Sequence, residues 1–226
     1  DWYFLSHRLG IARFLQKKGF EVHVCCKDTG KGALISSYNF IFHNTDMKRT
    51  SISLIKFLKE ALRIFNIIKK IKPDLVHLIS LRPIVLGCLI LLVKKNINIC
   101  MTFTGLGYIF ISKSIKNVFL RILIINIFRI SLKKVNFKVI IQNKDDFTYF
   151  LKKNVFKEDK IDIIRGSGIN LKHYKFYPEP KNKYITVCYT GRMLKDKGVH
   201  WLVQAFKQTK KEVKNLRLFL AGSLDI

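Results

Sequence analysis

The segment at residues 190–198 combines the residue types that best hold a phosphate group. It reads Thr-Gly-Arg-Met-Leu-Lys-Asp-Lys-Gly and joins a predicted strand to a predicted helix. A glycine lets the backbone turn tightly at the end of the strand, and the N–H groups at a helix N-terminus attract anions. Arg192 supplies a planar pair of donors and Lys197 a point charge, so we predict a diphosphate-binding loop, with an ordinary polar loop as the alternative. The predicted contacts are Gly191, Arg192, Lys197 and Gly198.

Two other glycine-containing turns follow predicted strands. The turn Thr104-Gly105-Leu106-Gly107-Tyr108 exposes backbone N–H groups and allows a ligand to approach closely, although it lacks the third glycine of a dinucleotide-binding fingerprint. The turn Gly166-Ser167-Gly168-Ile169-Asn170 follows the last strand of the first predicted domain and is a candidate for a cleft or a hinge. A purely structural turn is the alternative at both places. The candidate residues are Thr104, Gly105, Gly107, Tyr108, Gly166, Gly168 and Asn170.

The sequence contains no pattern that predicts a metal site. No Asp-x-Asp pair is present, and Asp145 and Asp146 are adjacent in a predicted helix and therefore point in different directions. The five cysteines have no Cys-x-x-Cys spacing, which is typical of a protein from a reducing compartment. His77 lies in a buried predicted strand, where a packed core histidine is expected more often than a ligand. We therefore predict no metal and no cofactor, and the sequence assigns no catalytic residue.

The chain is strongly basic, with 42 Lys and Arg against 15 Asp and Glu and a formal net charge of +27. Such a charge attracts nucleic acid, anionic lipid headgroups or anionic small molecules. The lysines are dispersed and no nucleic-acid-binding motif is recognisable, so we expect no nucleic acid partner. No apolar run reaches the roughly 18 residues of a membrane-spanning helix. Residues 115–134 alternate apolar and basic side chains, which predicts attachment to an anionic membrane surface unless the apolar stripe faces the core.

Strands and helices alternate along the chain, which predicts an α/β fold with parallel sheets. In such a sheet, ligands bind at the carboxyl ends of the strands, where all three turns described above lie. The strands are expected at 21–26, 39–43, 75–79, 97–103, 138–142, 161–165, 184–189 and 216–221. The helices are expected at 5–17, 53–70, 83–95, 115–134, 144–152 and 199–207.

A change in composition at residues 173–183, which contain two prolines and several lysines, predicts a linker between two domains. The first domain is expected at 1–172, and residues 184–226 form the first βαβ unit of the second. Because the chain begins at Asp1 and ends just after a predicted strand, we expect it to be an internal piece of a longer protein.

Taken together and in chain order, several stretches resemble the family-4 glycosyltransferases of the GT-B fold. The order of the matches makes the resemblance more specific than any single motif. The turn at 104–110 is similar to the branch of the family that builds lipopolysaccharide, capsule or exopolysaccharide units on an undecaprenyl diphosphate carrier. The matching stretches are residues 2–9, 19–24, 72–77, 104–110, 140–143, 166–170 and 191–198.

The resemblance implies two Rossmann-like domains that face each other across a cleft, the first without its first strand and the second incomplete in this chain. It implies a retaining, metal-independent transfer of a sugar from a nucleotide-sugar donor to an undecaprenyl-linked or oligosaccharide acceptor. It also implies a cytoplasmic enzyme, peripheral at the inner face of the cytoplasmic membrane. The donor diphosphate is expected at Arg192 and Lys197, and the acceptor on the N-terminal domain. The acceptor-side residues are expected to be Thr104, Gly105, Gly107, Tyr108, His7 and Arg8.

Two departures from the family pattern bear on the expected site. Thr104 stands where many members have the histidine of Thr-x-His-Gly, which puts a histidine role there in doubt. The paired glutamates that contact the donor are expected beyond Ile226, so this chain alone is expected to lack activity. Two other functions stay open: a nucleotide-sugar 2-epimerase of the same fold, against which the loop at 191–198 argues, and a basic nucleic-acid-binding module.

Overall fold

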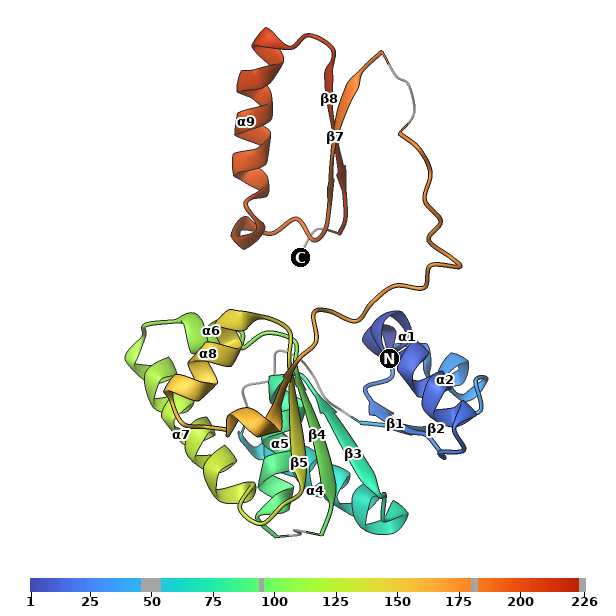
Figure 1. Ribbon diagram of the computed structural model, residues 1–226, viewed down its shortest axis with the longest axis vertical. Coiled ribbons are helices and arrows are strands. Elements are labelled where there is room, and N and C mark those ends of the chain that lie inside the picture. Colours follow the sequence, from blue (N-terminus) through green and yellow to red (C-terminus); the bar gives the residue numbers. More distant parts are fainter. Residues whose placement is uncertain (46–53, 94–95, 180–182, 224–226) are drawn as a thin grey trace. The chain divides into compact units, whose positions relative to one another are not determined.

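The computed structural model describes residues 1–45, 54–93, 96–179 and 183–223 (Figure 1). The chain divides into two compact units, Asp1–Ile169 and Asn170–Ile226, and each is described by itself. Within the described residues, no helix is both long enough and apolar enough to cross a membrane.

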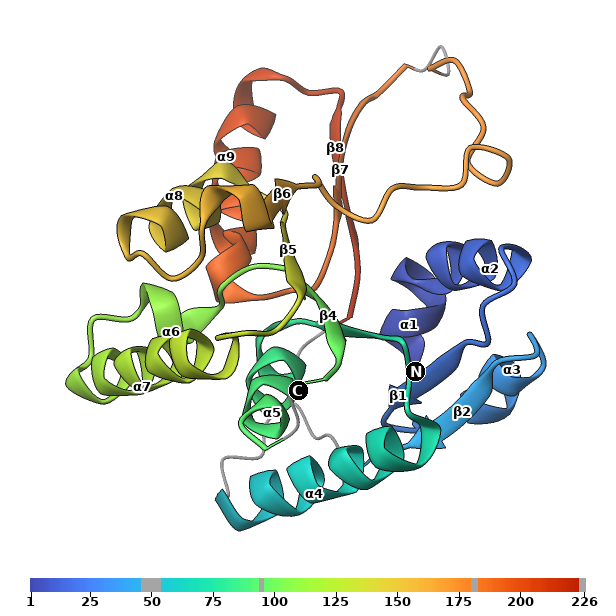
Figure 2. The same ribbon diagram turned by 60° about the horizontal axis from the view of Figure 1, so that its bottom comes forward.

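The first unit is built on a four-stranded parallel sheet with the strand order β3-β4-β5-β6. One face of this sheet packs against helices whose apolar side chains form the main core, centred on Met101, Phe103 and Val139, all fully buried (Figure 2). The strands are β3 Leu75–Ile79, β4 Asn98–Phe103, β5 Phe137–Ile141 and β6 Ile161–Ile163. The helices are α4 Leu54–Ile71, α5 Leu81–Leu91, α6 Tyr108–Ile111, α7 Ile115–Ser131 and α8 Lys144–Lys152, with a short 3-10 turn η1 at Glu158–Lys160.

A second, smaller sheet lies in the N-terminal part of the same unit. Strands β1 His23–Cys26 and β2 Ile41–Asn44 pair in parallel, and Val24 anchors a separate small core with Ala12, Ile35 and Phe40. The accompanying helices are α1 Trp2–His7, α2 Leu9–Lys17 and α3 Gly32–Ser36. Within the described residues, β1 and β3 each have a strand partner on one edge only.

The helix predicted over 5–17 proved to be two helices, α1 and α2, which meet at Arg8. The first helix begins earlier than predicted because the Asp1 carboxylate accepts a hydrogen bond from the N–H of Trp2 and caps the helix. The backbone of Arg8 leaves the helical region, with φ −124° and ψ −11°, and this break separates the two axes. Gly10, in the first turn of α2, adds to the break because glycine disfavours a continuous helix.

Other boundaries differ from the predictions by a few residues, and two short helices were not predicted. The strand expected at 39–43 begins at Ile41 because Asn39 adopts a positive φ of 61°. The helix expected at 83–95 begins at Leu81, since Pro83 fits in the first turn, and Lys94 and Lys95 lie outside the described residues. The unpredicted helices are α3 and α6.

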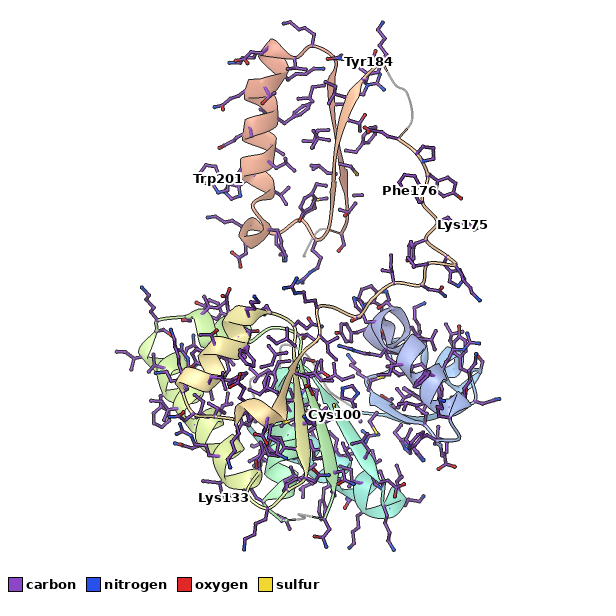
Figure 3. The ribbon with its side chains drawn as sticks, viewed as in Figure 1. Cys100, Lys133, Lys175, Phe176, Tyr184 and Trp201 are labelled. Atoms are coloured by element: carbon purple, nitrogen blue, oxygen red, sulfur yellow. The ribbon has the colours of Figure 1, made fainter. Side chains whose placement is uncertain are left out.

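The second unit contains one βαβ motif. Strands β7 Ile185–Thr190 and β8 Leu216–Ala221 pair in parallel, and helix α9 Val199–Glu212 connects them after a 3-10 turn, η2, at Lys195–Lys197. The residues expected to form a linker carry no helix or strand up to residue 179, and residues 180–182 are outside the described part. Aromatic side chains there are solvent exposed, with Phe176 at 91% (Figure 3).

Candidate functional site

The carboxyl ends of β7 and β8 hold two loops in close backbone contact. The N–H of Gly191 donates to the carbonyl of Ala221 at 2.9 Å, and the N–H of Met193 donates to the carbonyl of Ser223 at 3.0 Å. A Cβ placed on Gly222 would lie only 1.7 Å from the carbonyl oxygen of Gly191. Any side chain at position 222 would therefore displace the loop that begins at Gly191.

This loop presents the two cations singled out from the sequence. The Tyr189 hydroxyl donates to the carbonyl of Arg192 at 2.9 Å and holds the backbone of the loop. Lys197 ends the η2 turn, and Gly198, with a left-handed φ of 72°, leads into α9. Both cationic side chains belong to exposed residues, so the loop presents positive charge beside the N-terminus of a helix of 14 residues.

A histidine at the start of α9 was not singled out from the sequence. Nδ1 of His200 is buried and has no hydrogen-bond partner among the described residues. Its ring packs against Trp201 at a centroid distance of 4.6 Å, and Trp201 itself is 66% exposed (Figure 3). Nothing in the amino-acid pattern of α9 distinguishes this histidine.

In the first unit, the glycines of the turn after β4 adopt backbone conformations that other residues rarely reach. Gly105 has φ 122° and Gly107 has φ 73°, and a Cβ on either would meet no atom within 4 Å. Gly166 and Gly168, after β6, have φ of 72° and 70° and are equally open. These turns therefore leave open space beside their α-carbons at the carboxyl edge of the sheet, where ligands of parallel sheets bind.

Ser80 is a second residue that the sequence pattern did not reveal. It follows β3 and has φ 70° and ψ 160°, a combination that is costly for a residue with a side chain. Its N–H donates to the carbonyl of Thr102 at 2.9 Å, so pairing with β4 helps to hold this conformation. Strained backbone of this kind concentrates at functional sites, and Ser80 lies at the same carboxyl edge as the glycine turns.

His7 and Arg8 both contact the side chain of Tyr3. The ring of His7 stacks on that of Tyr3 with centroids 4.5 Å apart, and its Nδ1 is 2.6 Å from the hydroxyl of Ser6. The Nη2 atom of Arg8 donates to the hydroxyl of the same tyrosine at 3.3 Å. His7 is exposed, whereas Arg8 is only 9% exposed. His7 is therefore a surface side chain, and Arg8 carries a buried positive charge.

Arg8 also approaches the strands of the central sheet. Nε2 of His77 on β3 hydrogen-bonds to the Thr102 hydroxyl on β4 at 2.7 Å. Burial lowers the pKa of His77 to about 4, and the positive charge of Arg8 contributes to this shift. His77 is therefore neutral at physiological pH, which supports the expectation of a packed histidine.

Residues 1–143 match the family described as glycosyl transferase 4-like. The chain belongs to the glycosyl transferase 4-like family.

Relatives of this family member agree with its fold. It is 27% identical over 234 residues to the capsular polysaccharide biosynthesis glycosyltransferase CapM of Staphylococcus aureus, a match that covers 96% of this chain and 57% of the relative. A glycosyltransferase from Rickettsia africae ESF-5 superposes with a TM-score of 0.60 at 18% identity, over 94% of this chain and 63% of that one. The UDP-GlcNAc 2-epimerase of Methanocaldococcus jannaschii superposes with a TM-score of 0.52 at 12% identity, over 94% of this chain and 69% of that one. The chain thus spans little more than half the length of CapM, and the predicted GT-B class of α/β fold is confirmed.

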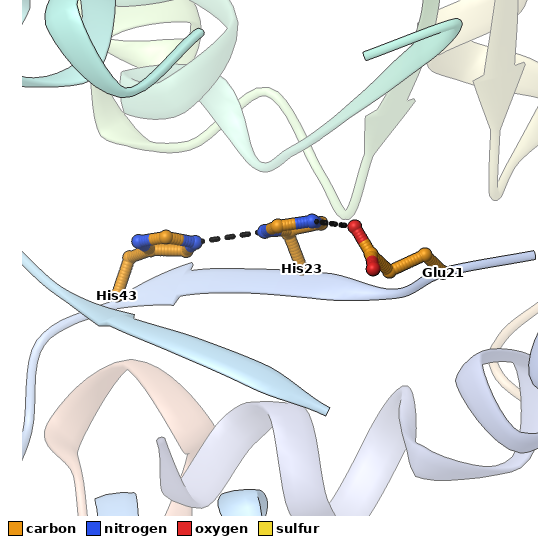
Figure 4. A network of polar contacts seen from close by, with 3 residues as sticks. All are labelled: Glu21, His23 and His43. Atoms are coloured by element: carbon orange, nitrogen blue, oxygen red, sulfur yellow. Dashed lines mark hydrogen bonds and ion pairs between the residues drawn. The ribbon is translucent and has the colours of Figure 1, made fainter. Parts of the chain in front are cut away.

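The glycosyl transferase 4-like chain also contains a histidine network away from these turns. His23 Nδ1 is 2.9 Å from His43 Nε2, and His23 Nε2 is 2.7 Å from the carboxylate of Glu21 (Figure 4). Burial lowers the pKa of His43, helped by His23 and by the positive charge of Lys70. The contact between His23 and His43 joins β1 to β2. No group of three or more His, Cys, Asp or Glu in the described residues could hold a metal ion.

A cavity of about 400 Å³ opens at the opposite edge of the central sheet. Most of its lining residues are polar and lie at or just before the first residues of the strands, and Asn98 Nδ2 donates to the carbonyl of Asp74 at 2.8 Å. The amino ends of parallel strands are not where such sheets bind ligands. We therefore place the candidate site at the carboxyl edges and not in this cavity.

Proposed function

We propose that this chain is part of a glycosyltransferase that moves a sugar from a nucleotide-sugar to an acceptor in bacterial cell-surface polysaccharide biosynthesis. The observation that carries the proposal is the loop of residues 191–198, which presents Arg192 and Lys197 between β7 and α9 in a member of this family. The similarity to CapM, which is named for capsular polysaccharide biosynthesis, supports the part of the proposal that concerns cell-surface polysaccharide.

The chemistry of the loop suits departure of a nucleoside diphosphate. Negative charge on the leaving diphosphate grows as the glycosidic bond breaks, and fixed cations stabilise it more in the transition state than in the ground state. Arg192 can donate two parallel hydrogen bonds to phosphate oxygens, and Lys197 adds a second charge. We propose that these cations take the part that a metal ion plays in other transferases and that transfer retains the anomeric configuration.

The acceptor is proposed to bind at the turn of residues 104–108 and at the exposed His7. We propose a lipid-linked or oligosaccharide acceptor, because the open glycine backbone at the carboxyl edge of β4 gives a saccharide room to approach. Gly166 and Gly168 extend this edge after β6, and Asn170 opens the second unit.

A product assay on the full-length protein tests this function against its nearest rival. The protein is incubated with a panel of nucleotide-sugars, with and without membrane-extracted lipid-linked acceptors. A transferase gives a glycosylated lipid and a nucleoside diphosphate only when the acceptor is present. Formation of the 2-epimer without any acceptor contradicts the proposal and supports an epimerase.

We further propose that the protein works at an anionic membrane surface and contacts it through α6 and the first half of α7. The side chains there are apolar and exposed, and Lys113 and Lys116 flank them. No acidic residue occurs between Tyr108 and Lys134. The exposed fractions are 75% for Tyr108, 77% for Ile111, 89% for Ile115, 71% for Phe119 and 53% for Ile122.

The contact differs from the stripe suggested by the sequence. Arg121 donates to the carbonyls of Ile109 and Ser112 and so fastens α6 to α7. Arg129 donates to the carbonyl of Lys153, and Ile127 packs against the core. The proposed attachment therefore rests on the corner between the two helices, which continues directly from the glycine turn at the end of β4.

A further inference from the structure

Arg8 carries a buried positive charge with very little to balance it. The residue is 9% exposed, and its single hydrogen-bond partner in the described part of the chain is the Tyr3 hydroxyl, 3.3 Å from Nη2. Nε is buried and has no partner there. A guanidinium does not lose its charge at physiological pH, and a buried unpaired charge is strongly unfavourable.

The carboxylates of Asp162 and Asp1 are both engaged by groups other than Arg8. Asp162 lies on the same face of the central sheet as His77, but its Oδ2 lies 3.7 Å from Nζ of Lys138. The Asp1 carboxylate accepts hydrogen bonds from the Thr29 hydroxyl and from the N–H groups of residues 29 and 31. Within the described residues, no carboxylate forms an ion pair with Arg8.

The surroundings of Arg8 are suited to an oxyanion. Its charge acts on His77 and on Cys100, which are paired in register on β3 and β4. Because burial and Arg8 hold the pKa of His77 at about 4, His77 adds a neutral ring and no second charge. Thr102, the hydrogen-bond partner of His77, lies two residues before Thr104, where the glycine turn starts.

We propose that Arg8, together with the hydroxyl of Tyr3, binds a phosphate group of the acceptor. This inference rests on the proposed function and deepens it, because it selects a phosphate-linked acceptor over a neutral oligosaccharide. The guanidinium Nε and Nη atoms form a planar fork that matches two phosphate oxygens. The Tyr3 hydroxyl, which accepts from Arg8, keeps its own proton to donate to the anion.

Paired acceptor analogues on the full-length protein test the proposal. One analogue carries the acceptor saccharide on a short-chain lipid diphosphate, and the other carries the same saccharide as an uncharged alkyl glycoside. Arg8→Gln is expected to raise KM for the diphosphate analogue by about 10- to 100-fold. KM for the neutral glycoside and for the donor should stay within about twofold of wild type.

Two further variants keep the test decisive if Arg8→Gln folds poorly. Arg8→Lys keeps the charge but loses Nε and the fork, so its KM for the diphosphate analogue should lie between those of wild type and Arg8→Gln. Arg13→Gln is the matched control, since Arg13 is an exposed arginine of α2 that lies over the ring of Tyr38. It should leave both KM values unchanged.

A binding measurement separates acceptor phosphate from donor phosphate. Full-length protein with Arg192→Ala and Lys197→Ala, and with labelled histidine, is titrated by NMR with and without inorganic pyrophosphate. An anion bound to Arg8 removes repulsion from His77, so the pKa of His77 should rise with pyrophosphate and should not respond in an Arg8→Gln background.

Four results overturn the proposal. Equal increases in KM for the charged and the neutral analogue in Arg8→Gln would assign Arg8 a general structural role. Unchanged KM for both, in a wild-type enzyme that transfers sugar normally, would overturn this inference while leaving the proposed function intact. Loss of thermal stability in Arg8→Lys, with no effect of pyrophosphate on wild type, would identify a protein group as the partner of Arg8. Absence of transfer to either analogue by the wild type would remove the proposed function and this inference together.

Discussion

Arg192 and Lys197 give the most direct residue-level prediction. Arg192→Ala or Lys197→Ala in the full-length protein should lower kcat for transfer about a hundredfold, because each removes a cation that stabilises the departing diphosphate by on the order of 3 kcal/mol. Arg192→Lys should not restore activity, since it lacks the planar fork. Steady-state transfer assays on folded variants measure the effect. Lys207→Ala, which removes an exposed cation farther along α9, is the control.

Wild-type kcat and wild-type donor KM in both alanine variants would contradict the diphosphate role. A loss of equal size in the α9 control would point instead to a general effect of positive charge.

His77 gives a prediction about stability and pH. Its pKa is about 4 in the folded chain, against an ordinary value of 6.5 that applies after unfolding. Between these values the unfolded state binds the proton more strongly than the folded state. The contribution of neutral His77 to the free energy of unfolding is therefore complete above pH 6.5 and declines as the pH falls towards 4. The free energy of unfolding at pH 4.5 should be lower by about 2–3 kcal/mol from this group alone.

Urea unfolding of wild type and His77→Gln at pH 7.5 and 4.5 isolates this contribution. Glutamine does not titrate and can still hydrogen-bond to Thr102. The free energy of unfolding of the variant, relative to that of wild type, should therefore be higher at pH 4.5 than at pH 7.5. An identical difference between the two proteins at both pH values would contradict the shifted pKa.

Some site residues could be read from the sequence and others could not. Gly105, Gly107 and Gly191 stand out because glycine directly after a predicted strand signals a special backbone conformation. Gly222 could have been found by the same rule, but the reason it must be glycine, the nearby carbonyl of Gly191, is a tertiary contact. The φ of Ser80 likewise depends on pairing with a strand far along the chain, which no local pattern encodes.

At the scale of elements, the corner of α6 and α7 should decide membrane attachment. Phe119→Gln combined with Ile115→Gln should abolish sedimentation with vesicles that contain phosphatidylglycerol, because each change removes exposed apolar area from the contact. Lys113→Gln with Lys116→Gln should weaken binding by about 1 kcal/mol for each lysine and only on anionic vesicles. Ile130→Gln, on an exposed site at the far end of α7, is the control.

Equal binding to anionic and neutral vesicles would contradict the electrostatic part of this proposal. Unchanged sedimentation of the Phe119 and Ile115 variant would show that another surface holds the membrane.

Helices and strands were predictable where their periodicity was long and uninterrupted. The helix predicted at 53–70 closely matches α4, and β3 has the predicted ends, because each is a clear run of apolar spacing. The break at Arg8 was not predictable, since the apolar positions of α1 and α2 continue one another in the sequence. The helix α3 is only five residues long, too short for a periodic signal.

At the scale of the whole molecule, the alternation of strands and helices was sufficient to predict parallel sheets and the fold class. The separation of β1 and β2 from the four-stranded sheet was not predictable, because sequence order does not state which strands are neighbours. The domain boundaries at 172 and 184 stay a prediction. The two compact units of the structure meet between Ile169 and Asn170.

The two units bury apolar surface very unequally, and this difference predicts how the chain opens. The first unit contains both hydrophobic cores, whereas Leu216 is the single buried apolar residue among the described residues of the second. Without a buried core, β7, β8 and α9 gain little from the hydrophobic effect to offset the entropy of ordering. In the 226-residue chain, native-state hydrogen exchange should therefore be fast in these three elements and slow in β3, β4, β5 and α5.

Mass spectrometry of peptides from the two units measures this contrast directly. Addition of urea at concentrations below global unfolding should raise exchange in the second unit only slightly, since its opening exposes little apolar surface, and should raise exchange of the central strands steeply as global unfolding is approached. Met101→Ala, in the main core, should raise exchange throughout β3–β5, while Leu202→Ala on half-buried α9 should leave those strands unaffected. Equal protection of β8 and β4 would contradict the argument, because it would require the second unit to draw its stability from contacts as extensive as those of the first.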